Sequence, residues 1–222
     1  MKHILTFIVG ITFILNVHAQ ESRWGITSSL GVSEVAIPIA DNQAYELKPS
    51  YGLGLVSEIQ LINHLSARLG VRYTRKGGQK NIQVWDGFRD VTVSKRAFRL
   101  SLIEIPVAVS LDFGKKNGFI LTGGIYYGLA FSGKAVRQDR GEPETSESIA
   151  FTDTFHPAEG RFQMKGADFG YIAMIGYKLD DVIIDLGLNA SIATVRPDNH
   201  PVDEYEWKHV VVKVNVSYFF NE

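Results

Sequence analysis

Hydrophobic and polar residues alternate along much of the chain with a period of two, the spacing that a β-strand gives. The clearest case is residues 97–133, which predict two long strands joined by a turn that contains Gly114 and Gly118. In the second of these strands, one face is apolar and the other is small or polar. The apolar face carries Phe119, Leu121, Ile125, Tyr127, Leu129 and Phe131. Because a helical face repeats every ~3.6 residues, this alternation favours a strand.

The same alternation predicts eight strands over the whole chain. They are residues 24–33, 50–61, 65–75, 96–112, 119–133, 162–178, 182–193 and 207–220. The connections alternate between short ones of 3, 6 and 3 residues and long ones of 16, 20, 28 and 13 residues. Short turns at one end and long loops at the other are typical of outer-membrane barrels. We therefore predict an all-β fold: an eight-stranded antiparallel up-and-down transmembrane β-barrel with short periplasmic turns and long extracellular loops.

Alternation alone does not say which face of each strand points outward. In a soluble lipocalin-like carrier the apolar faces would line the interior. Here the apolar faces carry charges only near the loop ends, aromatic residues gather near strand ends, and the polar faces are rich in glycine. These three features favour a wall between lipid and a crowded lumen in the outer membrane. We predict that Leu69, Ile125, Leu186 and Val214 face lipid.

The strand at residues 96–112 departs from simple alternation. Its residues Phe98, Leu100 and Leu102 have the opposite parity to the apolar positions that follow. A β-bulge near 102–104 would return both sets to one face. Since Pro106 cannot donate a ladder hydrogen bond, we expect a bulge or broken pairing within residues 102–106.

The first residues have the pattern of a secretory signal. Lys2 and His3 give a basic start, residues 4–17 are mostly apolar, and Ala19 ends a small-residue cleavage pattern. We expect a signal peptide at residues 1–19 and one barrel domain at 20–222. The chain has no cysteine, which excludes disulfide and thiol chemistry, and its net charge of −1 gives no basic excess for nucleic acid.

Charged residues on the predicted polar faces form the most specific candidate site, an ion-pair cluster in the lumen. They are Glu58, Arg68, Arg72, Glu104, Asp168, Asp185 and Lys213. Three are basic and four are acidic, so the set is close to balance. Side chains just fill an eight-stranded barrel, and buried charges must be paired. We expect pairs that link the second, third and fourth strands and plug the lumen; a polar conduit or binding site is the alternative.

The sequence offers little for catalysis or metal binding. Four histidines follow residue 20, at His64, His156, His200 and His209. Asp198, His200 and Asp203 lie close together but without a nucleophile or a strong metal-ligand spacing. Glu104 and Asp168 resemble paired catalytic carboxylates, yet a structural ion pair is the simpler use. We predict no enzyme activity, no cofactor and no metal.

Several short motifs, taken in order, resemble those of a known family. They are Ile103-Glu104-Ile105-Pro106, Gly123-Gly124-Ile125-Tyr126-Tyr127-Gly128-Leu129, Asp168-Phe169-Gly170, Asp185-Leu186-Gly187-Leu188 and the terminal Tyr218-Phe219-Phe220. With them the chain resembles the PorT-like outer-membrane β-barrel family of Bacteroidota. The resemblance implies a fold and an outer-membrane location but no reaction. It also implies that the aromatic C-terminal end is presented to the barrel-assembly machinery.

These observations rank several functions. The first is a non-enzymatic outer-membrane barrel that is structural or binds a ligand or partner through its extracellular loops. Its expected partners are outer-membrane lipid, the barrel-assembly machinery and an unidentified extracellular or secretion-system partner. An accessory role in secretion or envelope assembly, as in PorT, is the second, and a barrel enzyme acting on lipid or peptide is the third. A soluble lipocalin-like carrier follows if the faces are inverted. The charged loop at 134–161 is a candidate contact for a partner or polysaccharide.

Overall fold

The computed structural model describes residues 22–36, 43–85, 90–114, 117–157, 160, 162–199 and 208–220. The predicted signal peptide at 1–19 lies outside this set, as do His200 and Asp203. Within the described part of the chain, no helix has the length and apolar character needed to cross a membrane.

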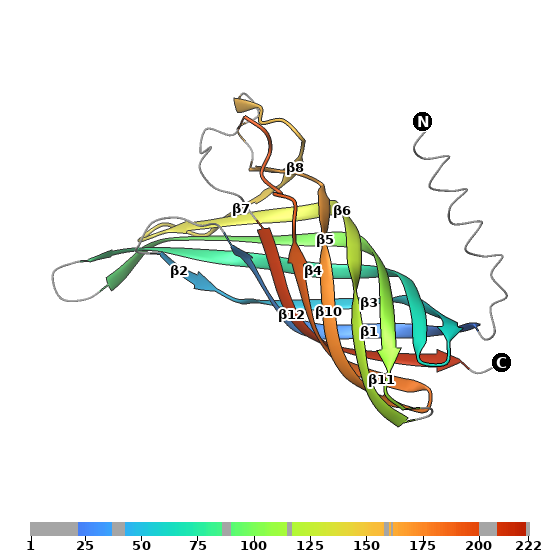
Figure 1. Ribbon diagram of the computed structural model, residues 1–222. Coiled ribbons are helices and arrows are strands. Elements are labelled where there is room, and N and C mark those ends of the chain that lie inside the picture. The colour runs from blue at the N-terminus through green and yellow to red at the C-terminus, as the bar shows by residue number, and fades with distance from the viewer. Residues whose placement is uncertain are drawn as a thin grey trace.

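Eight long antiparallel strands close into a ring. They are β1 (Ser22–Ala36), β3 (Lys48–Ile62), β4 (Leu65–Trp85), β5 (Asp90–Asp112), β6 (Asn117–Asp139), β10 (Ala167–Leu179), β11 (Val182–Ser191) and β12 (Lys208–Phe220). Each pairs with its neighbours in chain order, β6 pairs with β10, and β12 returns to β1. This confirms the predicted eight-stranded up-and-down barrel, which Figure 1 shows from the side.

Four short strands complete the sheets. β2 (Gln43–Glu46) pairs with the far end of β4, and β7 (Thr145–Ser148) pairs with β6. β8 (Ala150–Phe151) and β9 (Gln163–Met164) form a separate parallel pair. The predicted strand at 162–178 is therefore divided: β9 belongs to the extracellular segment and only β10 belongs to the barrel.

The two ends of the barrel differ in the way that the loop lengths predict. Short turns join β3 to β4, β5 to β6 and β10 to β11 at one end, where β1 begins and β12 ends (Figure 1). At the other end β4, β5 and β6 run past the ring as a projecting sheet (Figure 1). Residues 76–85, predicted as loop, continue β4. Gly77 lies in this strand, where a side chain would not fit, because a Cβ there would stand 2.2 Å from the Phe98 carbonyl oxygen.

The outer surface of the ring is apolar. Leu69, Ile125, Leu186 and Val214 are 39%, 47%, 55% and 46% exposed and face outward. The prediction for these four residues is confirmed, and the inverted, lipocalin-like arrangement is wrong. The exposed apolar positions run from Ile103 of β5 to Phe113, the residue that directly follows this strand. At about 3.3 Å per residue and a tilt of about 40°, this band is about 25 Å tall, the height of an outer-membrane hydrocarbon belt.

The prediction that a bulge turns Phe98, Leu100 and Leu102 toward lipid is wrong. Leu100 and Leu102 are each 1% exposed and point into the barrel, on the same face as Glu104. From Ser94 to Asp112, β5 keeps a single parity, and its inward positions change from charged to apolar above the membrane band. The physical reason is that the extracellular loops supply an apolar lid for these side chains to pack against.

The expected irregularity of the ladder is nevertheless present. In the described pairing of β4 with β5, neither Ile105 nor Pro106 has a partner, as expected where proline lacks an N–H. The register of β5 with β6 shifts between Ser101 and Leu102, where Phe131 of β6 is the extra residue. The bulge thus belongs to β6 and leaves the faces of β5 unchanged.

Candidate functional site

The seven charged residues singled out in the sequence all lie inside the barrel. Each is at most 7% exposed, and they come from β3, β4, β5, β10, β11 and β12. A further cation, Lys76 of β4, joins them at 1% exposure. The buried set is therefore four cations and four carboxylates: Arg68, Arg72, Lys76 and Lys213 against Glu58, Glu104, Asp168 and Asp185.

Glu58 organises the periplasmic part of this cluster. Its Oε1 accepts hydrogen bonds from Nε and Nη2 of Arg23 at 3.0 and 2.7 Å, and its Oε2 accepts from Arg68 Nε at 2.8 Å. Arg68 also reaches across the lumen to Asp185, with 3.6 Å between Nη1 and Oδ2. Strands β1, β3, β4 and β11 are thereby joined through two guanidinium groups.

Glu104 forms the middle layer. Arg72 donates to its Oε2 from Nε at 2.8 Å and approaches the same oxygen with Nη2 at 2.7 Å. Thr74 donates to Oε2 at 3.2 Å, and Lys76 Nζ lies 3.2 Å from Oε1. Glu104 is 1% exposed and has three cationic or hydroxyl partners, so its hydrogen bonds are satisfied without water.

Asp168 forms the extracellular layer. Its Oδ2 accepts from Lys76 Nζ at 2.5 Å and from the Tyr126 hydroxyl at 3.2 Å. Ser191 donates to Oδ1 at 2.6 Å, and His209 Nδ1 lies 3.3 Å from Oδ2. Since Lys76 contacts both Glu104 and Asp168, it connects the middle and upper layers.

Lys213 is held differently from the other cations. Within the part of the chain that the structure describes, no carboxylate lies at ion-pair distance from its Nζ. With the Asn189 amide turned so that its oxygen faces the cations, that oxygen accepts from Lys213 at 3.1 Å and from Arg72 at 2.9 Å. Lys213 belongs to the predicted cluster of seven residues, but it does not take part in the ion pairs that the structure describes.

Apolar side chains form a buried cluster near each end of the charged layers. Near the periplasmic end Ile120, Ile183 and Phe219 are fully buried and pack with Val56. At the extracellular end the buried cluster is Leu100, Leu102, Ala135, Ile149, Met164 and Val195. Phe98 stacks on Phe162 beside this cluster, with ring centroids 6.4 Å apart. The lumen is therefore polar in its middle and apolar at its extracellular end.

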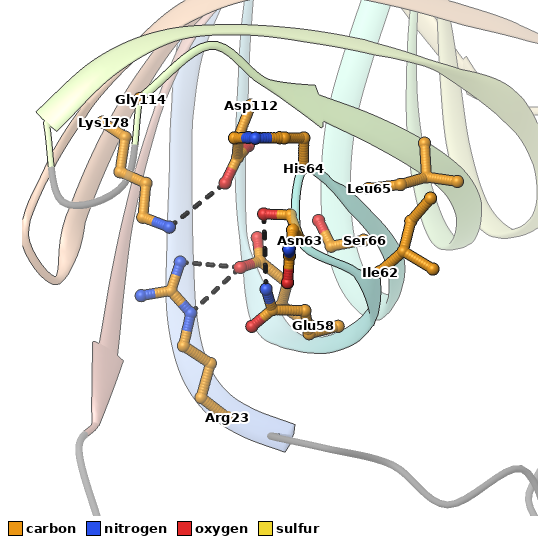
Figure 2. A pocket seen from close by; sticks show the side chains of 11 residues that line it. Arg23, Glu58, Ile62, Asn63, His64, Leu65, Ser66, Asp112, Gly114 and Lys178 are labelled. Atoms are coloured by element: carbon orange, nitrogen blue, oxygen red, sulfur yellow. Dashed lines mark hydrogen bonds and ion pairs between the residues drawn. The ribbon is translucent and has the colours of Figure 1, made fainter.

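A polar cavity of about 200 Å³ opens at the periplasmic mouth. Figure 2 shows Arg23 turned toward Glu58, and Lys178 turned toward Asp112 with 3.2 Å between Nζ and Oδ2. The turn residues Asn63 and His64 form one side of the cavity (Figure 2). Arg23 and Glu58, which pair at 2.7 Å, also line this cavity, so the lowest charged layer borders it.

The comparisons with known proteins agree with this architecture. A family model described as an outer membrane protein beta-barrel domain matches residues 18–194. The chain belongs to this family. It is therefore an outer-membrane β-barrel protein, and the apolar band lies in the outer membrane. Among curated proteins no relative matches the sequence.

Several solved structures resemble this outer-membrane barrel, with low sequence identity. Ail, the attachment invasion locus protein of Yersinia pestis, is 15% identical with a TM-score of 0.43, over 90% of this chain and 100% of Ail. Neisserial surface protein A is 13% identical with a TM-score of 0.44, over 90% of this chain and 100% of that protein. OprG from Pseudomonas aeruginosa is 11% identical with a TM-score of 0.40, over 90% and 95%. Such low values carry no information about what this barrel binds.

Some lumen residues of this outer-membrane barrel are not predicted from its sequence. Lys76 falls in the predicted loop at 76–95, although it continues the parity of Arg68 and Arg72. The parity of Lys213 likewise places His209 in the lumen. The predicted parity also places Tyr126 in the lumen, since Ile125 and Tyr127 on either side of it belong to the apolar face.

The Asp168, His209 and Ser191 side chains merit comparison with an acyl-transfer triad. In such a triad the serine hydroxyl contacts the histidine nitrogen that is not bound to the carboxylate. Here Ser191 donates to Asp168, and it is the backbone N–H of His209 that donates to Ser191, at 3.1 Å. No group of three or more histidine and acidic side chains in the described residues is arranged to hold a metal. The geometry is that of a structural network.

Proposed function

We propose that this protein is a closed, non-conducting and non-enzymatic outer-membrane barrel that acts at the cell surface through its extracellular segments. The filled lumen is the observation that carries the proposal. Three charged layers occupy its middle, and an apolar cluster covers its extracellular end. An ion moving through the barrel would have to break these pairs and cross this apolar cluster.

The energetics of the lumen support closure. Removing one partner of a buried ion pair costs about 3–5 kcal/mol because the other charge stays buried. With four cations and four carboxylates, the layers compensate one another and need no mobile counter-ion. The cavity between Arg68, Asp185 and Asn215 measures about 50 Å³, too little for a continuous water-filled path.

The extracellular segments are built as an ordered cap. The chain after β11 crosses the segment after β8, where Phe155 N–H donates to the Asp198 carbonyl at 2.8 Å and Asp198 N–H donates to Asp153 at 2.7 Å. Lys165 pairs with the Asp198 carboxylate at 2.7 Å. Figure 1 shows the two segments side by side above the ring. A cap fixed in this way loses little conformational freedom on binding a partner.

Residues 140–148 are the most accessible part of the cap. Every one of them is exposed, and they include Glu142, Glu144 and Glu147 against Arg140. They follow the end of β6 and pass through β7, which pairs with β6 on one side. We assign this acidic segment to contact with an extracellular partner or polysaccharide.

Planar-bilayer recording of the purified protein tests the closed lumen. The wild-type barrel is expected to give no steady single-channel conductance, while a conducting porin reconstituted in the same way serves as the positive control. A matched variant, Leu100→Ser with Met164→Ser, opens the extracellular apolar cluster and tests whether the charged layers alone stop ions. Reproducible conductance of the wild-type barrel would refute the proposal.

Binding by intact cells tests the role of the cap. Cells that display the wild-type barrel are compared on a polysaccharide and matrix-protein array with cells whose residues 141–147 are replaced by a Gly-Ser segment of equal length. Heat modifiability on a gel verifies that both barrels are folded. Loss of a binding signal only in the replaced variant supports the proposal, and equal signals contradict it.

The narrower assignment to PorT-like proteins, with an accessory role in secretion, stays a prediction. The family match is to the broader barrel domain. Crosslinking in the native envelope followed by identification of the partner distinguishes the two roles, because a secretion accessory requires a stable envelope complex.

A further inference from the structure

Three cations lie in a row on the outer wall, directly above the apolar band. Arg99 of β5 is opposite Lys134 of β6 in the register. Arg75 of β4 is opposite Ser101, which places it diagonally next to Arg99. Directly opposed residues of antiparallel strands project from the same face, so all three side chains share the outward surface. Arg99 and Lys134 are exposed and Arg75 is half-buried.

This row has no acidic partner in the part of the chain that the structure describes. Among the described residues, no carboxylate forms an ion pair with Arg75, Arg99 or Lys134. Like charges placed directly opposite each other destabilise a sheet. The next opposed cations on these strands are Arg96 and Arg137. This pair has a compensating acidic partner, because Asp139 lies 2.6 Å from Arg137 Nη2.

An aromatic surface lies immediately below the cations. The rings of Tyr51 and Tyr73 are 6.4 Å apart, and those of Tyr73 and Phe131 are 6.2 Å apart, so they form a continuous row across β3 to β6. Arg75 Nη1 donates to the Tyr51 hydroxyl at 3.0 Å, which holds the guanidinium at the edge of this row. Phe131 is 59% exposed. Aromatic girdles mark the membrane interface, and the loops lie on the same side as these residues.

The geometry points to a docking site for a phosphorylated lipid of the outer leaflet. Its phosphate lies against Arg75, Arg99 and Lys134, and its acyl chains lie along Tyr73, Phe131 and the apolar wall below. Anionic headgroups are attracted by basic residues at a membrane surface, and arginine forms bidentate contacts with phosphate. The lipid relieves the repulsion between Arg99 and Lys134 that the protein leaves uncompensated. This inference rests on the location of the barrel and not on its proposed surface role.

Native mass spectrometry of the purified barrel in zwitterionic detergent micelles tests the site. The protein is titrated with diphosphorylated lipid A, with the same lipid after removal of its phosphates, and with inorganic phosphate. The variant Arg75→Gln/Arg99→Gln/Lys134→Gln is compared with Lys95→Gln/Arg96→Gln/Arg140→Gln. This control removes the same charge from exposed positions that lie farther along β5, at Lys95 and Arg96, and in the turn after β6, at Arg140.

The wild-type and control barrels are expected to bind the diphosphorylated lipid with similar dissociation constants. At roughly fivefold per cation, the first variant is expected to bind it on the order of 100-fold more weakly. Removal of the phosphates should weaken binding to the wild type similarly, and inorganic phosphate should not displace the lipid. Arg99→Lys keeps the charge and should retain most of the affinity. A heat-modifiability gel verifies that each variant is folded.

Three results would overturn the inference. If the first variant binds the phosphorylated lipid as tightly as the wild type does, the three cations do not form a lipid site. Equal weakening in the control variant shows a general charge effect and no specific site. Displacement of the lipid by inorganic phosphate at comparable concentration makes the ligand a free anion and not a lipid.

Discussion

Truncation of Glu104 tests the energetics of the lumen most directly. This carboxylate is 1% exposed and contacts Arg72 at 2.7 Å, Lys76 at 3.2 Å and Thr74 at 3.2 Å. In Glu104→Ala, Arg72 keeps only uncharged partners, while Lys76 keeps Asp168. Removing one member of a buried ion pair costs about 3–5 kcal/mol, and we expect the free energy of unfolding to fall by that amount.

Reversible urea unfolding in lipid vesicles measures this loss, with tryptophan fluorescence and gel mobility as two independent signals. For a slope of about 2–3 kcal/mol per M, the midpoint should fall by roughly 1–2 M. Glu147→Ala is the matched control, because Glu147 is exposed on β7 and its removal should change stability by at most about 0.5 kcal/mol.

A double substitution separates pairing from packing. Replacing both members of a buried ion pair by apolar residues is often neutral or stabilising, so Arg72→Met with Glu104→Leu should recover more than half of the loss. The remaining buried charges then number three of each sign. If Glu104→Ala costs less than about 1 kcal/mol, water already solvates the lumen, and the account of a dry ion-pair network is refuted.

Further predictions concern other parts of the barrel. Lys76→Met removes the cation shared by Glu104 and Asp168 and should destabilise the barrel by about 3–5 kcal/mol in the same urea assay, with partial recovery in Lys76→Met/Asp168→Asn. Leu102→Ala should cost about 2–5 kcal/mol by leaving a cavity in the extracellular apolar cluster. Phe220→Ala should reduce the fraction of barrel assembled in cells, scored by heat modifiability, with the urea midpoint of the assembled protein unchanged. A large fall in that midpoint would show that Phe220 contributes to the stability of the folded barrel and not to its assembly.

The strand pattern predicts the ring because lipid imposes one rule on every outward position. Leu69, Ile125 and Val214 must all be apolar whatever their neighbours are, and a period of two makes this visible in the sequence. The inward positions of the membrane band are equally regular, which is why all seven predicted charges lie in the lumen.

Above the membrane that rule no longer applies. Leu100 and Leu102 face inward because Ile149, Met164 and Val195 cover them, and these partners come from loops whose packing leaves no periodic signal. The sequence does not predict Lys76 as a lumen residue, for a related reason. The two glycines that follow it favour a turn by composition, while cross-strand pairing with β5 keeps them extended. Whether the sequence pattern predicts the direction in which a side chain points thus depends on where the residue lies relative to the bilayer.

The contacts across the lumen have a consequence for how the barrel forms. Arg68 on β4 reaches Asp185 on β11, and Lys76 on β4 reaches Asp168 on β10, so the N-terminal and C-terminal halves of the chain meet through charged groups in the interior. These contacts join distant parts of the sequence and are absent from any open sheet. Until β12 meets β1, Arg68 lacks its contact with Asp185 and Lys76 lacks its contact with Asp168. Closure should therefore be a single concerted step, with a half-closed ring too costly in free energy to accumulate.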